Sequence, residues 1–579
     1  MSVATTIPGL YYSFVRPPSE SSPLRTDVAG FLGRTLRGPT SSDEVRDPNH
    51  LAPKPPTHPI AIRVEGWREY ERLFGGLVKD AMTPYALRGY FDNGGQVAHV
   101  IRLLGQDPNT QEAAKVASGS WQVGTFTSGK LNPDWPGAGH FQAIGYSFAA
   151  NTPGDWANDT TITVRYWAAG ASGKPEVELE IIPPDEPPEL LSAIAPENIA
   201  EEVNNRSAYV QLIPNDLPAG LLPAQLNAPP GPRYLEWPAF KLTGGTSFAP
   251  SKQDYLDAVQ VLGDKPEVAL VACPDLYPDL AQHYSDLTQS AQKDALAQDQ
   301  TDVLSTLLIQ AEQLHDRLVI IDVPSEQADP IDAVQWVEQR LRESPDLRDE
   351  KRLRNGAVYH PRLLVPDPLG GVSAPLRCVP CSGLVAGVIS RLDDQQGAYF
   401  TPANAEIDEA VDLSRTLKAN EQLLLYNDGI NLLKCSPSRG LLVWGGRVLG
   451  QRLAKAEKPS SSIPLGGAVA HRRLIHLLVR AIRRVAEPLV FDTNGPELWL
   501  KFVRSITSVL LEAYRAGALK GDAPNQAFQV TCDATTNPQE NIDSGIVVCE
   551  IQVAPAVPME FILLRVSASK EGKLEVFES

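Results

Sequence analysis

Helical and strand-like patterns alternate along residues 251–356, and this alternation restricts the possible folds more than any other feature of the chain. DYLDAVQVL (254–262) has the apolar spacing of a helix, and EVALVACP (267–274) is a continuous apolar run typical of a buried strand. The same order continues in three further segments: TDVLSTLLIQAEQL (301–314), RLVIIDVP (317–324) and IDAVQWVEQRL (331–341). Strands joined through helices pack in layers with right-handed crossovers, so this region predicts an α/β domain.

Residues 106–245 carry a different pattern. Tryptophan, glycine, threonine and proline recur there, and helical periodicity fades. TTITVRYWAAG (160–170) and PEVELEIIPP (175–184) alternate polar and apolar residues, as half-buried strands do. This stretch predicts a β-rich domain inserted ahead of the α/β region.

Both ends of the chain mix helices with strands. Apolar spacing predicts helices over Gly66–Leu77, Pro84–Phe91, His471–Val485 and Pro496–Leu519. Alternating or continuous apolar runs predict strands over Thr26–Leu36, Val97–Leu103, Gly545–Val553 and Glu560–Val566. The predicted fold class is therefore α+β, divided among several domains.

The charge balance excludes some classes of partner. Lys and Arg number 52 against 70 Asp and Glu, which gives a formal net charge of −18. A nucleic-acid binder or a protein that docks on anionic lipid needs surplus basic residues, so neither is expected. No apolar run is long enough to insert directly into a membrane. The first residues, MSVATTIPGLYYSFV, do not read as a secretory signal. With only six cysteines, the chain is expected to assemble in a reducing cytoplasm.

Gly245-Thr246-Ser247 resembles the serine motif of subtilisin-type peptidases. A serine nucleophile needs a positioned base, and no Asp-Ser/Thr-Gly or His-Gly motif precedes Ser247. The pattern therefore favours a glycine turn ahead of a helix, and a peptidase remains the remote alternative.

Cys378 and Cys381 have the CxxC spacing of zinc and redox sites. No second ligand pair with zinc-site spacing occurs, and the motif lies among Pro, Gly and Ser rather than at a predicted helix start. Gly-rich phosphate-binding loops are also absent from the sequence. We therefore expect no catalytic residues, no metal and no cofactor.

A basic stripe occupies the helix predicted from His471. Arg472, His476, Arg480 and Arg484 follow one another at intervals of four residues, opposite an apolar face of Leu, Ile and Val. Two interpretations stay open: a solvated face paired with local carboxylates, or an electrostatic contact with an acidic partner.

Several segments, taken in order, resemble the contractile tail sheath family of phage tails and phage-tail-like injection particles. The N-terminal matches are PGLY (8–11), VAGFLGRTLRGP (28–39), WREYERLFGG (67–76) and YALRGYFDNGGQVAHVIRL (85–103). The C-terminal matches are YHPRLLVPDPLGG (359–371), PCSGLVAGVISRLDDQQGAYFTPAN (380–404), LYNDGINLLKCSPSRGLLVWGGRVL (425–449), FDTNGPELW (491–499) and FQVTCDATTNPQENIDSGIVVCEIQVAPAVPMEFILLRV (528–566). The resemblance covers about 100 N-terminal and about 210 C-terminal residues, and residues 106–245 match nothing in the family.

The resemblance implies a division of the chain. An inner α/β-type domain would be built from both chain ends, with a middle α/β domain and a β-rich outer insertion. The expected parts are an extended arm (1–25), the N-terminal part of the inner domain (26–105), the insertion (106–245), a non-catalytic middle domain of subtilisin-like fold (246–356) and a C-terminal sheath domain ending in a strand arm (357–579).

The resemblance also implies self-assembly. Subunits would stack as rings around an inner tube and exchange strands with their neighbours, with baseplate and terminal cap proteins as further partners. The residues expected in strand exchange are Leu10, Tyr11, Tyr12, Phe14, Val15, Phe561, Ile562, Leu563, Leu564 and Val566. The residues expected at the tube are Lys501, Arg504 and Arg515, and secondly Arg472, Arg480 and Arg484.

The particle itself is open to two interpretations, an injection particle of the antifeeding-prophage kind or a contractile phage tail, because sheaths of both share these motifs. A particle of either kind could be released from the cell or anchored to a membrane through its baseplate. A monomeric adhesin built around the tryptophan-bearing insertion is an alternative from another class.

Overall fold

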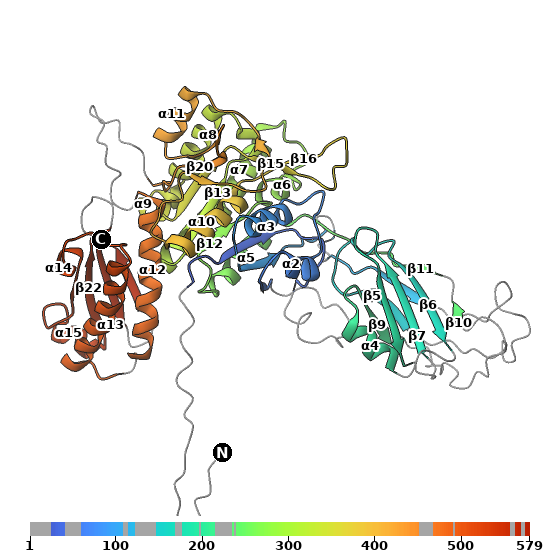
Figure 1. The fold of residues 1–579 in the computed structure, drawn as a ribbon, viewed down its shortest axis with the longest axis horizontal. Coiled ribbons are helices and arrows are strands. Elements are labelled where there is room, and N and C mark those ends of the chain that lie inside the picture. The colour runs from blue at the N-terminus through green and yellow to red at the C-terminus, as the bar shows by residue number, and fades with distance from the viewer. Residues whose placement is uncertain are drawn as a thin grey trace, which may run out of the picture.

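The structure is a computed structural model, and it describes residues 25–40, 59–107, 110, 114–121, 146–167, 176–195, 198–214, 234–236, 239–450, 467–489, 492–555, 562–568 and 574–578. Three bodies follow one another along its longest axis (Figure 1). A β-rich insertion lies at one end, a C-terminal unit at the other, and a large α/β body between them.

The central α/β body is built on a nine-stranded sheet. In spatial order its strands are β17 (Ala405–Glu406), β20 (Gly440–Trp444), β19 (Asn431–Ser436), β14 (Gly356–His360), β13 (Leu318–Asp322), β12 (Leu270–Ala272), β1 (Ala29–Gly33), β3 (Ala98–Arg102) and β2 (Ala61–Val64). The strands from β19 to β3 run parallel, and β2, β20 and β17 are antiparallel to their neighbours. Five of these strands are buried along their whole length, which explains their continuous apolar sequence.

Helices cover both faces of this sheet. One face packs against α2 (Trp67–Phe74), α3 (Thr83–Asp92) and α10 (Ser382–Gln396). The other packs against α5 (Lys252–Gly263), α6 (Leu276–Ala281), α7 (Ser290–Leu314), α8 (Pro330–Trp336), the π-helical turn η3 (Val337–Arg342), α9 (Glu350–Leu353) and α11 (Ala419–Asn427). Short 3-10 turns η2 (Ser325–Gln327) and η4 (Pro345–Leu347) connect them. The α/β architecture expected from residues 251–356 is present.

The insertion has a core of its own between two antiparallel sheets. One sheet contains β10 (Tyr234–Glu236), β6 (Thr161–Trp167), β7 (Glu176–Ile182), β8 (Glu189–Ile194) and β11 (Phe240–Lys241), and the other contains β4 (Ser118–Trp121), β5 (Tyr146–Ala150) and β9 (Val210–Pro214). Helix α4 (Ile199–Arg206) packs beside β9. The β-rich character expected for this region is therefore present among its described residues.

The C-terminal unit combines two long helices with a four-stranded sheet. Its elements are α12 (Val469–Ala486), the turn η5 (Glu487–Leu489), α13 (Pro496–Arg515), α14 (Pro524–Ala527), β21 (Phe528–Thr531), α15 (Gln539–Ser544), β22 (Val547–Val553), β23 (Ile562–Ala568) and β24 (Leu574–Glu578). A further small sheet on the central body contains β16 (Leu376–Val379), β15 (Leu363–Pro366) and β18 (Asp412–Leu413).

The central sheet joins strands from segments that are far apart in the sequence. Residues 26–105 supply β1, β2 and β3 to the central sheet, and residues 357–450 supply most of β14 and all of β19 and β20 to the same sheet. Only the chain from α12 onward forms the C-terminal unit. β1 is buried on both faces and pairs in parallel with β12 and β3, and tertiary packing sets the identity of those neighbours.

Helices α3 and α10 approach closely because glycines line their contact. A Cβ at Gly383 would overlap the carbonyl oxygen of Ala86, and a Cβ at Gly387 would overlap that of Tyr90. Both obstacles are helix backbone, which cannot rotate aside as a side chain can.

We expect Gly383→Ala to destabilise the central body by about 1–3 kcal/mol, since the added methyl group forces the two helices apart. A Cβ at Gly76 meets nothing within 4 Å, so Gly76→Ala is the matched control and should change stability by less than about 0.5 kcal/mol. Urea unfolding followed by tryptophan fluorescence measures both variants. Equal midpoints for the two would contradict the packing argument.

Candidate assembly interface

Helix α12 has an apolar face and a basic face, and each packs against a different part of the structure. Its apolar face contributes Leu474, Leu478 and Ile482 to the core that it shares with α13 and the four-stranded sheet. Its basic face points the other way, toward the central body (Figure 1). The helix therefore joins the C-terminal unit to the nine-stranded sheet.

The basic stripe of α12 is largely buried, which corrects both interpretations of the sequence pattern. Arg472, Arg473 and Arg480 are 1%, 3% and 8% exposed. Arg484 is half-buried, and the structure records an interaction for it. Arg472 and Arg480 are thus neither a solvated face nor an available tube contact, because their guanidinium groups are used inside the subunit.

These arginines bind residues that lead into the parallel strands. Arg480 donates to the carbonyl oxygens of Arg25 (2.9 Å), Glu267 (3.1 Å) and Asp316 (3.1 Å), which precede β1, β12 and β13. Arg472 Nε donates to Asn355 Oδ1 at 2.8 Å, just before β14. Because these four strands are parallel neighbours, their amino ends meet at one edge, and α12 lies across that edge.

One buried ion pair supplements these carbonyl contacts. Both terminal nitrogens of Arg473 bind the carboxylate of Asp393 near the end of α10, and Arg473 also donates to the Thr26 carbonyl at 2.7 Å. The Thr26 hydroxyl donates to the same carboxylate at 2.8 Å. Burial raises the pKa of Asp393, and the Arg473 charge and hydrogen bonds oppose that shift.

Burial also shifts the pKa values of other groups in the contact between α12 and the central body. It lowers the pKa of Arg480 to about 10, so this arginine still carries its charge at neutral pH. Burial lowers the pKa of His476 well below its usual value, and the charges of Arg472 and Arg480 add to the effect. Neutral His476 lies 3.2 Å from Asn355 Oδ1, where its Nε2 hydrogen can be shared.

The remaining basic residues expected at the tube lie on the outer face of α13. Lys501, Arg504 and Arg515 are exposed, and Lys501 pairs with Asp492 at 2.8 Å. That hydrogen bond raises the pKa of Lys501.

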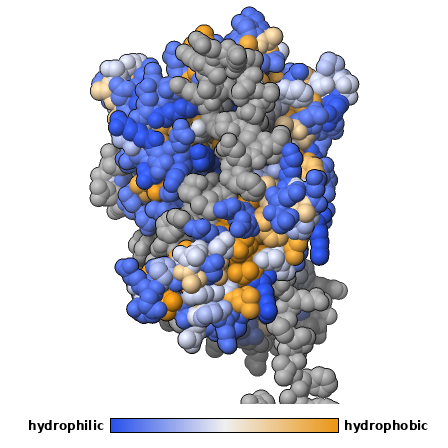
Figure 2. Space-filling model, turned by 90° about the vertical axis from the view of Figure 1, so that its left-hand side faces the viewer, coloured by the Kyte–Doolittle hydropathy of each residue, from blue (hydrophilic) through white to orange (hydrophobic). Residues whose placement is uncertain are grey.

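Leu500, on the same helix, is 49% exposed. Figure 2 shows this side of the molecule, where hydrophobic patches lie among hydrophilic residues. The α13 face therefore combines charge with accessible apolar surface.

The C-terminal strands pair within the described chain. β23 runs antiparallel to β22 in the register from Val547↔Ala568 to Val553↔Ile562, and β24 pairs with β23. Ile562, Leu563, Leu564 and Val566 of the expected exchange set lie in β23. Phe561 and the N-terminal members, Leu10, Tyr11, Tyr12, Phe14 and Val15, lie outside the described residues. β21 and β24 are the two edges of this sheet as described.

Ser247 is not arranged as a nucleophile. Its hydroxyl donates to Asp155 Oδ1 at 2.6 Å and accepts from the Asp155 backbone N–H at 3.0 Å. The partner of this hydroxyl is therefore a carboxylate 92 residues away in the chain and not the imidazole base that serine peptidases use. Ser247 thus links the insertion to the segment leading into α5.

The CxxC motif divides between two environments. Cys378 is exposed on β16, whereas Cys381 is buried at the start of α10, 3.5 Å from Asp322 Oδ1. Burial raises the pKa of the Cys381 thiol well above its usual value. Within the described ranges no group of three or more His, Cys, Asp and Glu side chains could hold a metal ion. The helices described there also include none that is long and apolar enough to cross a membrane.

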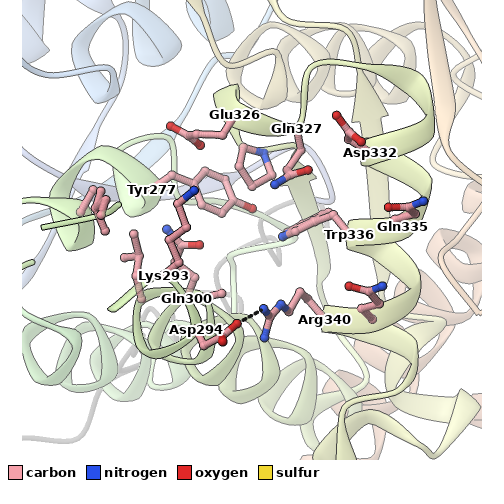
Figure 3. A pocket seen from close by; sticks show the side chains of 16 residues that line it. Tyr277, Lys293, Asp294, Gln300, Glu326, Gln327, Asp332, Gln335, Trp336 and Arg340 are labelled. Carbon is pink, nitrogen blue, oxygen red and sulfur yellow. Dashed lines mark hydrogen bonds and ion pairs between the residues drawn. The ribbon is translucent and has the colours of Figure 1, made fainter. Parts of the chain in front are cut away.

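A cavity of about 450 Å³ lies between α7 and the α8–η3 segment (Figure 3). Tyr277 and Trp336 form its aromatic wall, and an ion pair between Arg340 and Asp294 (3.1 Å) lies at its edge. The Tyr277 hydroxyl donates to the Asp322 carbonyl. Its polar lining consists of amide, acidic and basic side chains, among them Gln300, Glu326 and Lys293.

A family model for the phage tail sheath C-terminal domain matches residues 467–569, which coincide with α12 to β23. The tail sheath protein of Vibrio phage KVP40 is 27% identical over 196 residues. That alignment covers 33% of this chain and 27% of the relative, so the chain matches about a quarter of the relative's length.

Solved structures share the fold over nearly the whole chain. The sheath tail protein of Listeria innocua has a TM-score of 0.56 at 12% identity and covers 94% of this chain and 95% of its own. The contracted baseplate structure of the anti-feeding prophage contains a chain with a TM-score of 0.52 at 17% identity, covering 96% and 97%. The family-model match and the tail sheath relatives agree with the resemblance to the contractile tail sheath family found in the sequence.

We expect Arg473→Met to destabilise the protein by about 3 kcal/mol, because it leaves the Asp393 carboxylate buried without its cation. Arg439→Met is the matched control: it removes a similar arginine from an exposed pair with Glu406 and should cost less than about 1 kcal/mol. Urea unfolding followed by circular dichroism measures both variants. If the two costs are equal, the buried pair does not hold the units together.

Proposed function

We propose that this chain is a sheath subunit that polymerises as rings around an inner tube and contracts to drive the tube through a target envelope. The observation that carries the proposal is the C-terminal unit, where the family match coincides with a separate body bearing two open sheet edges. The proposal extends beyond the matched segment to the whole chain, which the fold likeness supports.

The proposed joints between subunits are exchanged strands. An extended segment that pairs along β21 or β24 would gain main-chain hydrogen bonds that do not depend on its side chains. Residues 8–15 supply such a segment in the sequence, and the strand following Pro558, which pairs with β22 and β24 within this chain, would exchange those partners for a neighbour's. Joints made of backbone hydrogen bonds can persist while the bodies that they connect rotate and repack.

The arrangement of the three bodies supports an orientation in the sheath. The insertion and the C-terminal unit lie at opposite ends of the central body (Figure 1). If α13 faces the tube, the insertion faces outward, where its contacts would be with the surroundings of the particle. Baseplate and cap proteins are the further partners that a ring stack requires at its ends.

Contraction in this proposal releases energy stored during assembly. Subunits would enter a strained extended array and then repack over larger interfaces, which needs no nucleotide hydrolysis in the sheath. We favour an injection particle of the antifeeding-prophage kind, with a contractile phage tail as the alternative. Neighbouring genes distinguish them, because capsid and packaging genes indicate a phage.

We expect deletion of residues 1–20 to abolish tubes and rings of the purified chain, because it removes the proposed N-terminal exchange segment. Negative-stain electron microscopy with the candidate tube protein measures assembly, and circular dichroism checks that the truncated chain stays folded. A monomeric adhesin would show the same association state with and without these residues, and that result would contradict strand exchange.

We expect Lys501→Glu with Arg504→Glu to reduce co-sedimentation with the tube protein about tenfold, since two favourable charges become repulsive. Lys241→Glu with Arg72→Glu is the matched control, because it makes the same charge change in exposed ion pairs on other bodies. Equal co-sedimentation of both variants would exclude the α13 face as the tube contact.

A further inference from the structure

Two cysteines lie opposite each other on neighbouring strands of the C-terminal unit. β21 pairs with β22 in the register Thr531↔Glu550, and the next step of that register places Cys532 opposite Cys549. Directly opposed residues of antiparallel strands have Cα atoms about 4.5 or 5.5 Å apart. Both spacings lie within the range of about 4.4–6.8 Å that a disulfide bridges.

Both side chains point to the same face of the sheet. Every second residue of β22 is buried, and Cys549 belongs to that buried set. Cys532 and Cys549 are 8% and 2% exposed and belong to the core that the sheet forms with α12 and α13. The register and the shared core therefore place the two thiols on the same side of neighbouring strands.

The loop after Cys532 holds this pair in place. Asn537 is buried and donates from Nδ2 to Cys532 Sγ at 3.7 Å and to the Val548 carbonyl at 3.0 Å. Its Oδ1 accepts from the Val548 N–H at 2.6 Å. One side chain thus ties the residue next to Cys549 to the sulfur of Cys532.

The environment also makes the two thiols unequal. Hydrogen bonds from Cys549 and Asn537 lower the pKa of Cys532, against burial and the nearby charge of Asp533. The pKa of Cys549 is raised because it donates to Cys532 and is buried. Cys532 is the more exposed of the two, at 8% against 2% for Cys549, and the exposed residues Asp533, Ala534 and Thr535 follow it in the chain.

We propose that Cys532 and Cys549 are a modification site that a low-molecular-weight disulfide oxidises to a cross-strand disulfide. The Cys532 thiolate attacks one sulfur of the reagent, the reagent's S–S bond breaks, and one reagent thiolate leaves. Cys549, once deprotonated, attacks Sγ of Cys532 itself, the bond from that sulfur to the reagent's sulfur breaks, and the second reagent thiolate leaves. The protein loses two protons and two electrons, and the reagent is reduced to two thiols.

The disulfide would stabilise the C-terminal unit, whose sheet has β21 and β24 as its edge strands. It closes the loop containing α15 and fixes β21 to β22, which restricts the unfolded chain more than the folded one. A reducing cytoplasm keeps the thiols free, and an oxidising exterior favours the bridge. This inference does not depend on assembly as a sheath, since it concerns a single folded chain.

The test uses the full-length chain with Cys378→Ser and Cys435→Ser, which removes the two exposed thiols that would react first. Four cysteines remain from the six in the sequence: Cys273, Cys381, Cys532 and Cys549. After incubation of the native protein with oxidised glutathione, thiols are counted in denaturant. We expect the count to fall from four to two, with reversal by a reductant. A count that stays at four overturns the proposal.

Peptide mapping assigns the bridge. Trypsin would leave both cysteines on one peptide, because no Lys or Arg lies between Lys520 and Arg565. A glutamate-specific protease cuts after Glu540 and separates them, so a non-reduced pair of peptides joined through Cys532 and Cys549 is the expected product. A bridge between any other pair, or glutathione retained on Cys532 as the end product, overturns the proposal.

A second measurement follows thermal unfolding instead of the number of free thiols. Oxidised wild-type protein should unfold at a temperature roughly 5 °C higher than the reduced protein, because the loop is closed. Adding Cys549→Ser to the test background should abolish this shift and leave glutathione on Cys532. The same shift in that variant would overturn the assignment of stabilisation to this bridge.

Discussion

The structure depends on the contact between the arginines of α12 and the amino edge of the parallel sheet. Arg472 and Arg480 use guanidinium nitrogens to bind groups that precede four neighbouring strands, and Arg473 adds a buried ion pair with Asp393. Each of these buried cations would be costly to remove from water without such partners. The seam therefore holds the C-terminal unit in one position relative to the central sheet.

A contact made by buried arginine hydrogen bonds requires a more specific geometry than a contact between apolar side chains. Leucine faces can slide past each other at little cost, whereas a planar guanidinium requires acceptors at particular positions. The opposite face of α12 supplies the apolar contribution, through Leu474, Leu478 and Ile482. One helix thus combines hydrophobic stabilisation on one side with positional specificity on the other. In the proposed contraction, this allows the central body and C-terminal unit to rotate together while contacts between subunits change.

Local pattern predicted much of the secondary structure. The helices and strands expected between residues 254 and 341 are present as α5, β12, α7, β13 and α8 with η3, and α2 and α3 lie where their apolar spacing placed them. The local pattern did not predict which strands pair with one another. The central sheet joins β1, β2 and β3 from residues 26–105 with β19 and β20 from residues 357–450, and the continuous apolar sequence of a fully buried strand such as β1 does not specify which strands flank it. Likewise, only the register of β21 on β22 brings Cys532 opposite Cys549.

The sequence by itself determined that α12 would be an amphipathic helix with a basic face, since arginines at intervals of four residues lie on one side of any helix. It also determined the family resemblance and the multidomain α+β class. Only the tertiary structure decided that this face is buried while the basic residues of α13 stay exposed. The reason is physical: the acceptors of Arg480 are backbone carbonyls from segments far apart in the chain, and every residue has such a carbonyl. No side-chain pattern could mark them before the sheet brought their strands together.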